Sequence, residues 1–458
     1  MSSNHGKPAT TAGSDGLRRC LGPVAVTAQA VGTVGLTLTA VFNIPEAMRS
    51  AGSATWISYA LALVVVLLVG ETLVLFRQLP GSPSGIAGYV AAGLGARTGA
   101  AASWALLLGY GATLLACLVF FGFFLEKLLL HLGWQTPQLL AYLIGGLGCL
   151  ELARRDVQLS TRTMLLTESV SGLIILALTV AIVRQGWGVP DLRAINPLSD
   201  TTAQVRSGLM VAVLSFIGFE SAANLGREAL QPERAVPRSI RTAVLIAGGL
   251  FVIWGAFLPE GLAWLPASVR LELDPLSSLA EHLGIPGAGL WIKVGALLCL
   301  FGTCLGSLTA LARLGYGLAE QRLLPRPLAR VHPRSGAPAN ALLSSGLPLV
   351  AGGAVVVQHN LSISQIFGLF GGFSVLCFLL VYGLVACSSL QVALPGNSRR
   401  RRWLVGGASL LAVAAISVTY LTSVVGQQNG MLITWAVLLL IGALRAWWVL
   451  PAGRQPAS

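Results

Sequence analysis

The stretch LSFIGFESAANLGREALQPERAVPRSI, residues 214–240, places a glutamate directly after an apolar segment. No charged residue occurs from Ser207 to Phe219, and Glu220 follows the pair Gly218-Phe219. A carboxylate at the centre of a membrane helix costs about 2.5–3.5 kcal/mol on insertion scales, so such a residue predicts a functional position. This prediction requires that the segment lies in a membrane.

The composition indicates a membrane protein. The chain has 458 residues, of which 55% are hydrophobic and only 10% are charged, whereas soluble domains carry about 25% charged residues. Apolar runs of about 18 to 25 residues recur along the chain, and each is long enough to cross a hydrocarbon core of about 30 Å. We therefore expect an all-α polytopic membrane protein.

Twelve transmembrane helices are predicted. Placing both termini in the cytoplasm puts most of the 30 Lys and Arg residues on the inside, including RRRR at 399–402, as the positive-inside rule requires. The net charge of +13 is then a topology signal and gives no reason to expect nucleic acid as a partner. We expect the plasma membrane, the inner membrane in a bacterium. The expected spans are 28–50, 53–76, 101–125, 137–153, 162–183, 207–226, 239–258, 289–318, 341–357, 366–388, 403–424 and 430–450.

The remaining segments are assigned by composition. Residues 1–27 and 451–458 are polar and are expected to be disordered cytoplasmic tails, with no signal peptide at the start. The sequence DPLSSLAEHL within 259–289 predicts a short surface helix, and the glycine-rich segment 79–99 is expected at the membrane interface. The seven cysteines and the loop histidines show no ligand spacing, so neither a metal site nor a cofactor is predicted.

Two predicted spans carry interruptions at matching places. Span 28–50 contains Asn43 and Pro45 within an apolar run, and span 207–226 contains Gly218. Interrupted helices at corresponding positions are typical of transporters built from two similar halves. Each half here would have five spans, an odd number, so the halves would be inverted: a first repeat at 28–183 and a second at 207–388.

Three blocks of sequence resemble the amino acid–polyamine–organocation (APC) permeases, of the amino acid permease type. FIGFES…REALQPERAVPRSI is similar to the helix 6 signature of that superfamily. Residues 307–343 resemble the exit of helix 8, with its Arg, LLP and VHPR, and residues 70–90 resemble the segment joining helices 2 and 3. The blocks lie in register over residues 28–390, the expected transport core, and helices 11 and 12 at 403–450 extend it.

The resemblance implies a five-plus-five inverted-repeat fold of the leucine-transporter type, with substrate between the unwound middles of helices 1 and 6. An unwound turn frees backbone polar groups, which is tolerable in a membrane only where they face a cavity. In helix 1, Leu38-Thr39-Ala40 stands where amino acid carriers of the superfamily commonly have Gly-Ser-Gly. An amine or an unusual small metabolite therefore stays open beside an α-amino acid. The implied substrate-binding residues are Thr37, Leu38, Thr39, Ala40, Phe216, Ile217, Gly218, Phe219, Glu220, Thr303 and Ser307.

The acidic residues in the predicted spans allow more than one interpretation of their role. Glu220 could anchor the unwound turn of helix 6, accept a proton, or serve as a hydrogen-bonded structural carboxyl. Glu168 stands where many proton-coupled members of the superfamily carry a lysine, so it is the first candidate for proton coupling, unless it only reaches water at the helix end. Glu71 lies close to a helix end and is expected to be structural. Phe216 and Phe219 are candidate aromatic caps, and small residues around Thr303 and Ser307 also fit close helix packing.

The function expected is secondary active transport of an amino acid or related small amine, coupled to protons, by alternating access. No nucleotide-binding P-loop occurs, so the energy would come from gradients. An amine, polyamine or metabolite exchanger of the same fold and a non-transporting sensor are the alternatives. A major facilitator would need a long central loop, which is missing between the sixth and seventh spans. An enzyme would need a nucleophile with a base or a metal set, and none assembles from the sequence.

Overall fold

The structure is a computed structural model, which describes residues 16–79, 85–184, 201–270, 272, 274–285, 287–332, 336–359, 361–393 and 396–450. Its regular elements over these residues are helical, as predicted. The α-helices are α1 (Pro23–Val34), α2 (Leu36–Leu38), α3 (Ile44–Ala51), α4 (Thr55–Leu75), α5 (Gly85–Leu94), α6 (Ala96–His131), α7 (Gln138–Arg155), α8 (Val157–Arg184), α9 (Thr201–Ser215), α10 (Pro232–Ala263), α11 (Ala267–Arg270), α12 (Pro275–His282), α13 (Ala288–Glu320), α14 (Ala339–Gln358), α15 (Ile363–Ile366), α16 (Gly372–Gln391), α17 (Arg399–Val424) and α18 (Asn429–Val449).

Ten stretches of the described residues are long and apolar enough to cross a membrane. One of them, Pro23–Leu75, covers both of the first two predicted spans. Helix α7 coincides with the predicted span 137–153 but is not among the ten. The number of twelve spans therefore stays a prediction, whereas a multi-pass helical membrane protein is confirmed.

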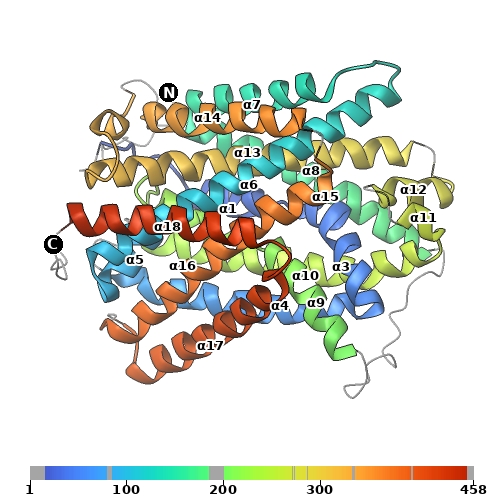
Figure 1. Ribbon diagram of the computed structural model, residues 1–458. Coiled ribbons are helices and arrows are strands. Elements are labelled where there is room, and N and C mark those ends of the chain that lie inside the picture. Colours follow the sequence, from blue (N-terminus) through green and yellow to red (C-terminus); the bar gives the residue numbers. More distant parts are fainter. Residues whose placement is uncertain are drawn as a thin grey trace, which may run out of the picture.

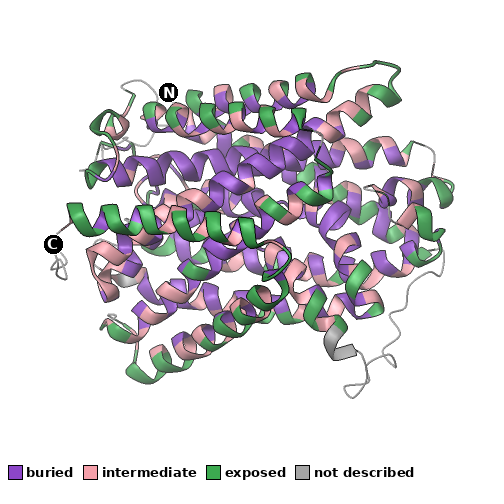
Figure 2. Ribbon diagram, viewed as in Figure 1, coloured by how far each residue is buried: buried purple, intermediate pink, exposed green. Residues whose placement is uncertain are grey.

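The helices form a bundle with a buried centre. Figure 1 shows α5 at one end of the bundle and the short helices α11 and α12 at the other. Figure 2 shows that α6 and α13 are largely buried, whereas α17 and α18 expose much of their surface. The predicted short helix is present as α12, whose N-cap Asp274 accepts a hydrogen bond from the Ser277 amide at 3.3 Å, but five of its eight residues are buried, so it is not a surface helix.

The first helix is interrupted at Gly35. Helix α1 ends at Val34, and Gly35 has φ 72° and ψ 69°, a left-handed conformation that favours glycine. The short α2 follows, then a π-helical turn at Thr39–Asn43, and then α3. The interruption is therefore upstream of the predicted Asn43 and Pro45. Pro45 lies in the first turn of α3, where a missing amide hydrogen breaks no helical hydrogen bond.

The sixth predicted span is interrupted at Gly218, which confirms that prediction. Helix α9 ends at Ser215, Gly218 has φ 112°, and the chain continues as a 3₁₀ helix, Phe219–Leu225. This conformation is readily available only to glycine. Helix α10 then begins at Pro232.

The two interruptions are in contact. A Cβ atom added at Gly218 would lie 2.7 Å from the carbonyl carbon and oxygen of Thr33. Ser221, in the 3₁₀ helix, donates a hydrogen bond to the Gln29 carbonyl of α1 at 3.1 Å. Small residues on α13 allow a third helix to approach: a Cβ at Gly306 would overlap the Thr33 hydroxyl. Close packing thus accounts for part of the small-residue stripe on α13.

The disordered tail predicted at 1–27 includes residues that the structure shows to be ordered. Residues 1–15 lie outside the described residues, but residues 16–22 run in an extended conformation to the start of α1 at Pro23. The amides of Cys20 and Leu21 both donate to the Glu228 carbonyl, at 2.9 and 3.0 Å, and the Leu230 amide donates to the Leu21 carbonyl at 3.0 Å. Backbone pairing with a distant segment orders this part of the chain. The expected tail at 451–458 lies outside the described residues.

Candidate substrate site between the two interrupted helices

A cavity of about 60 Å³ lies beside the interruptions of the first and sixth helices. Of the residues predicted to bind substrate, it gathers Leu38, Ile217 and Thr303. The other lining residues come from the same helices and from α6, η8 (Phe367–Gly371) and α16. They are Thr33, Val34, Asn43, Thr113, Ala116, Cys117, Phe120, Leu214, Ser215, Phe367, Gly371 and Ser374.

The polar side chains around this cavity are hydrogen-bonded mainly to one another and to carbonyl groups. The Asn43 amide nitrogen donates to the Ser215 hydroxyl at 3.0 Å. The hydroxyls of Thr113 and Ser374 are 2.7 Å apart. Thr303 donates to the Gly32 carbonyl of α1 at 3.2 Å. The cavity is therefore lined with hydroxyl groups whose hydrogen bonds connect the interrupted first helix to α9 and α13, and α6 to α16.

An aromatic cluster covers one side of the cavity. The ring centroid of Phe42 lies 5.0 Å from that of Phe120 and 4.8 Å from that of Phe367. Phe120 and Phe367 line the cavity, whereas the predicted caps Phe216 and Phe219 do not. Those two side chains are buried among other aromatic rings instead, because they flank the Gly218 turn and point into the packed helices.

The other predicted substrate residues lie near the cavity but do not line it. Thr39 and Ala40 are buried in the π-helical turn. Thr37 and Ser307 are also buried, and the hydroxyl oxygen of each has no hydrogen-bond partner within the described part of the chain. The residues predicted from the superfamily thus lie on helices that border the cavity, but several of them are on faces that do not line it.

Glu220 is buried and fully hydrogen-bonded. Its carboxylate accepts hydrogen bonds from the Tyr110 hydroxyl at 2.5 Å, from the Tyr382 hydroxyl at 2.8 Å and from the Gly218 amide at 3.1 Å. Its exposed fraction is 0%. The carboxylate therefore joins α6 and α16 to the turn at Gly218. The two tyrosines were not predicted, since an aromatic side chain in an apolar span carries no signal of its partner.

Glu168 is buried at the other interruption. It is 2% exposed, and its Oε2 atom accepts a hydrogen bond from the Leu36 amide, the first residue of α2, at 3.2 Å. Its Oε1 atom accepts no hydrogen bond of ordinary geometry in the described residues, and the thiol of Cys299, a weak donor, is the other polar group beside the carboxylate. A carboxylate at the amino end of a helix is favoured by the exposed amides there. Glu168 thus caps the helix that follows Gly35.

Glu71 takes part in a partly exposed ion-pair cluster, in agreement with its structural reading. Its carboxylate contacts the Arg241 guanidinium at 2.5 and 2.8 Å and the Arg401 guanidinium at 3.5 Å. These contacts join α4, α10 and α17. All seven cysteines are free thiols, and the described residues include no group of three or more His, Cys, Asp or Glu that could hold a metal ion.

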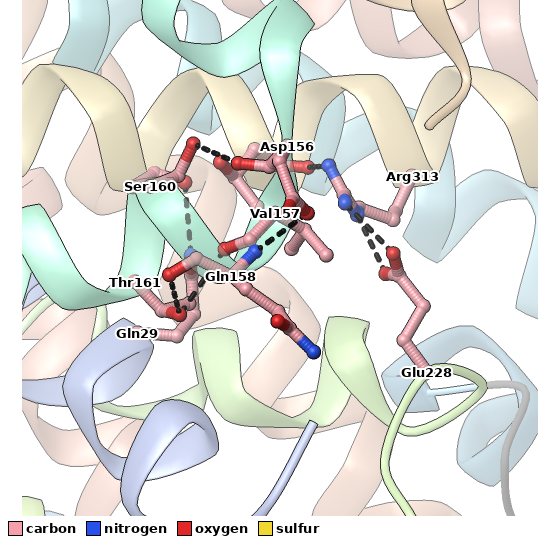
Figure 3. Close-up of polar contacts among 10 residues, drawn as sticks. Gln29, Asp156, Val157, Gln158, Ser160, Thr161, Glu228 and Arg313 are labelled. Atoms are coloured by element: carbon pink, nitrogen blue, oxygen red, sulfur yellow. Dashed lines mark hydrogen bonds and ion pairs between the residues drawn. The ribbon is translucent and has the colours of Figure 1, made fainter. Parts of the chain in front are cut away.

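A buried ion pair lies beside the N-terminal segment and was missed in the sequence. Arg313 of α13 contacts both oxygens of Glu228 at 2.8 and 2.9 Å, as Figure 3 shows. Gln158 of α8, also drawn there, donates to the Cys20 carbonyl at 2.9 Å. The signal was present, because Arg313 lies inside the predicted span 289–318, near its end, and charged residues within such spans are rare and paired.

Comparison with known proteins gives a consistent family assignment. The amino acid permease family model matches residues 26–425. A protein of Mycobacterium tuberculosis named only as an uncharacterized transporter is 30% identical over 256 residues, 54% of this chain and 55% of its own length. The D-serine/D-alanine/glycine transporter of Escherichia coli K12 is 26% identical over 40% of this chain and 38% of its own. The mouse cationic amino acid transporter 4 is 30% identical over 31% and 22%.

The match to the first of these relatives spans about half of that protein's length. The family and these relatives are transporters, not enzymes. Because the family model covers most of the chain, including both interruptions and the cavity, the resemblance drawn from the sequence is confirmed. This chain belongs to the amino acid permease family of the APC superfamily.

Proposed function

We propose that this protein is a secondary active transporter that carries an amino acid or a related small amine across the plasma membrane by alternating access. The observation that supports this most is the cavity between two interrupted helices whose interruptions touch each other at Gly218 and Thr33. Interrupted helices around a central cavity are how membrane transporters place backbone groups where a polar substrate can use them.

The finer architecture belongs to the same proposal. Twelve spans with both termini in the cytoplasm would consist of two inverted five-helix repeats, 28–183 and 207–388, followed by two further helices. The glycine interruptions at Gly35 and Gly218 occur in the first helix of each half, which supports this arrangement. The exposed surfaces of α17 and α18 fit helices added outside the transport core.

Coupling to protons is assigned to Glu168. Its carboxylate bridges to the interrupted first helix through the Leu36 amide, and its Oε1 atom accepts no hydrogen bond of ordinary geometry within the described residues. Protonation at Oε1 would remove the uncompensated charge and leave Oε2 bonded to the Leu36 amide, and loss of the proton would make that bond charge-assisted again. Co-transport of one proton supplies about 2.3 kcal/mol per 100 mV and about 1.36 kcal/mol per pH unit.

Glu220 is assigned the role of anchor. Three donors hold its carboxylate, so it fixes the conformation of the Gly218 turn and keeps α6 and α16 against it. This role agrees with one reading of the sequence and makes Glu168 the better candidate for the coupling group.

The test is transport in proteoliposomes containing the purified full chain. We expect labelled amino acid to accumulate when the outside is acidified, and to exchange with unlabelled amino acid in counterflow without a gradient. Exchange without any response to pH would identify an exchanger of the same fold. Ligand-induced thermal stabilisation without counterflow would instead identify a sensor and overturn the transport proposal.

A further inference from the structure

We propose that the cavity takes a compact amino acid with an uncharged side chain, of the size of glycine or alanine, and that Asn43 accepts a hydrogen bond from its ammonium group. This inference rests on the proposed transport function and specifies its substrate class. It is carried by the volume of the cavity, by the kinds of side chain that line it, and by one buried oxygen atom without a partner.

The volume limits the size of the substrate. The cavity measures about 60 Å³. A single water requires about 10–15 Å³ of such space, so the cavity has room for roughly four to six non-hydrogen atoms. Glycine and alanine are of this size, whereas leucine, glutamate and arginine are larger. The stacked rings of Phe120 and Phe367, with centroids 6.3 Å apart, also line the cavity and limit the space within it.

The lining residues limit the charge of the substrate. None of the residues that line the cavity is acidic, basic or a histidine. The two buried carboxylates at the interruptions, Glu168 and Glu220, are not among the lining residues, and they accept hydrogen bonds from the Leu36 and Gly218 amides. A charged side chain on the substrate would be buried without a counter-ion, which costs several kcal/mol. The lining therefore selects an uncharged side chain.

Asn43 supplies the contact to the ammonium group. Its side chain is 5% exposed and lines the cavity. The Nδ2 atom donates to Ser215, but the Oδ1 atom has no hydrogen-bond partner in the described residues. A buried acceptor without a partner is unfavourable, so a donor in the cavity would stabilise it. An ammonium group is the strong donor that an amino acid offers.

The hydroxyl groups of Thr113 and Ser374, on α6 and α16, can donate a hydrogen bond to the carboxylate of the bound amino acid. Thr113 and Ser374 both lie 3.1 Å from the Gly109 carbonyl and 2.7 Å from each other. One hydroxyl proton is enough to satisfy that carbonyl, so the second can turn toward a ligand oxygen. The cavity thereby offers both a donor and an acceptor without a charged side chain.

The first test compares amino acids as competitors for uptake of labelled glycine in proteoliposomes. We expect unlabelled glycine and alanine to compete, and leucine, glutamate and arginine to fail at a hundredfold higher concentration. If arginine, glutamate or leucine is transported while glycine is not, the substrate class is wrong but the transport function stands. If no amino acid is transported or exchanged, the proposed function itself fails.

The second test addresses Asn43. We expect Asn43→Leu to weaken glycine binding by about 10- to 100-fold, as for loss of a hydrogen bond to a charged group. We also expect the preference for glycine over propionate, which has the same number of non-hydrogen atoms but a methyl group in place of the ammonium group, to shrink by a similar factor. The matched control is Ser215→Ala, which removes the partner of Nδ2 and leaves Oδ1 in place. If the two variants lower glycine binding equally and leave the preference unchanged, Asn43 is structural and the contact is refuted.

The third test reduces the cavity at Gly371, which lines it in a helical conformation. A Cβ there would meet its nearest neighbours only at 3.7 Å, so alanine fits without a clash. We expect Gly371→Ala to weaken alanine binding by about 10- to 200-fold, the range for one methylene in a tight pocket, and glycine binding much less. Gly249→Ala, with no atom within 4 Å of the added Cβ, is the control. An unchanged ratio of alanine to glycine affinity would overturn the size limit.

Discussion

Two buried carboxylates stand at the two helix interruptions, and they differ in how completely they are hydrogen-bonded. Glu220 accepts three hydrogen bonds, from two tyrosine hydroxyls and from the Gly218 amide. Glu168 accepts one from the Leu36 amide, and within the described part of the protein the carboxylate is otherwise approached only by the weakly donating Cys299 thiol. Both side chains are almost fully buried.

The difference indicates which carboxylate keeps one position and protonation state and which can change its protonation state. A carboxylate with donors to both oxygens is held in one state, because each donor would lose its acceptor if the group moved or was protonated. A carboxylate with one free oxygen can gain a proton without breaking a bond. The interruption of the sixth span is therefore expected to keep one conformation. The interruption of the first helix can change as Glu168 gains or loses a proton.

The largest effect is expected at Gly218, in the interruption of the sixth span. Gly218→Val places a side chain within 2.7 Å of the Thr33 backbone at φ 112°, where strain alone costs about 1–3 kcal/mol. We expect loss of ligand-induced thermal stabilisation and of transport. The control is Gly249→Val, since no atom lies within 4 Å of its added Cβ. Normal ligand stabilisation in Gly218→Val would mean that the turn is not fixed.

The next effect is expected at Glu220. Glu220→Gln should remain folded in the membrane but lose about 1–3 kcal/mol of stability, because an amide nitrogen now faces groups that donated to an oxygen. Transport should fall strongly at every pH. Thermal unfolding in detergent and uptake measured from pH 5 to 8 check both. Should activity be normal above one pH and lost below it, Glu220 would be a titrating group and the contrast with Glu168 would reverse.

A more selective effect is expected at Glu168. Glu168→Gln resembles the protonated side chain permanently, so uptake driven by a pH gradient should be abolished. Exchange of labelled for unlabelled substrate should survive, because it requires no release of a proton. Both modes are measured in the same vesicles, with and without the gradient. Accumulation in response to pH by the mutant would exclude Glu168 as the coupling group and make Glu220 the next candidate.

The smallest effect is expected at Asp274, a partly buried carboxylate at the start of α12, outside the interrupted helices. Burial raises the pKa of Asp274, although Ser277 and Lys293 oppose the shift. A raised folded-state pKa means that this group's stabilising contribution is present below about pH 4, the ordinary value for aspartate, and is lost as pH rises through the raised pKa. Asp274→Asn should lack this dependence. Transport should be unchanged, and thermal unfolding of both proteins between pH 4 and 8 measures the difference.

The helical membrane class and the helix carrying the sixth-span interruption could be read from the sequence. Long apolar runs have few alternatives in a bilayer, and Gly218 beside Glu220 marks a place where a continuous helix would be unusual. The interruption of the first helix was predicted too far along the chain. Pro45 is a conspicuous helix breaker, whereas Gly35 is one glycine among many. Only the backbone conformation distinguishes them.

The cavity was only partly predicted. Leu38, Ile217 and Thr303 were identified because alignment selects helices, but the face that each helix presents depends on packing. Asn43 was noticed only as a helix breaker, and its free oxygen becomes evident from its bond to Ser215. Pairs such as Glu220 with Tyr110 and Tyr382 join helices that are distant in sequence, and no local pattern specifies them.

The pairing of Leu21 with the segment at Glu228 also bears on how the protein is made. The two partners are about 200 residues apart, and a ribosome adds about 5–20 residues per second, so the later one emerges on the order of 10–40 s after the earlier one. During that interval the backbone amides of residues 20 and 21 have only water or lipid headgroups as partners. The segment at Cys20 and Leu21 can therefore form its native pairing only after the chain has been synthesised through the sixth predicted span to Glu228.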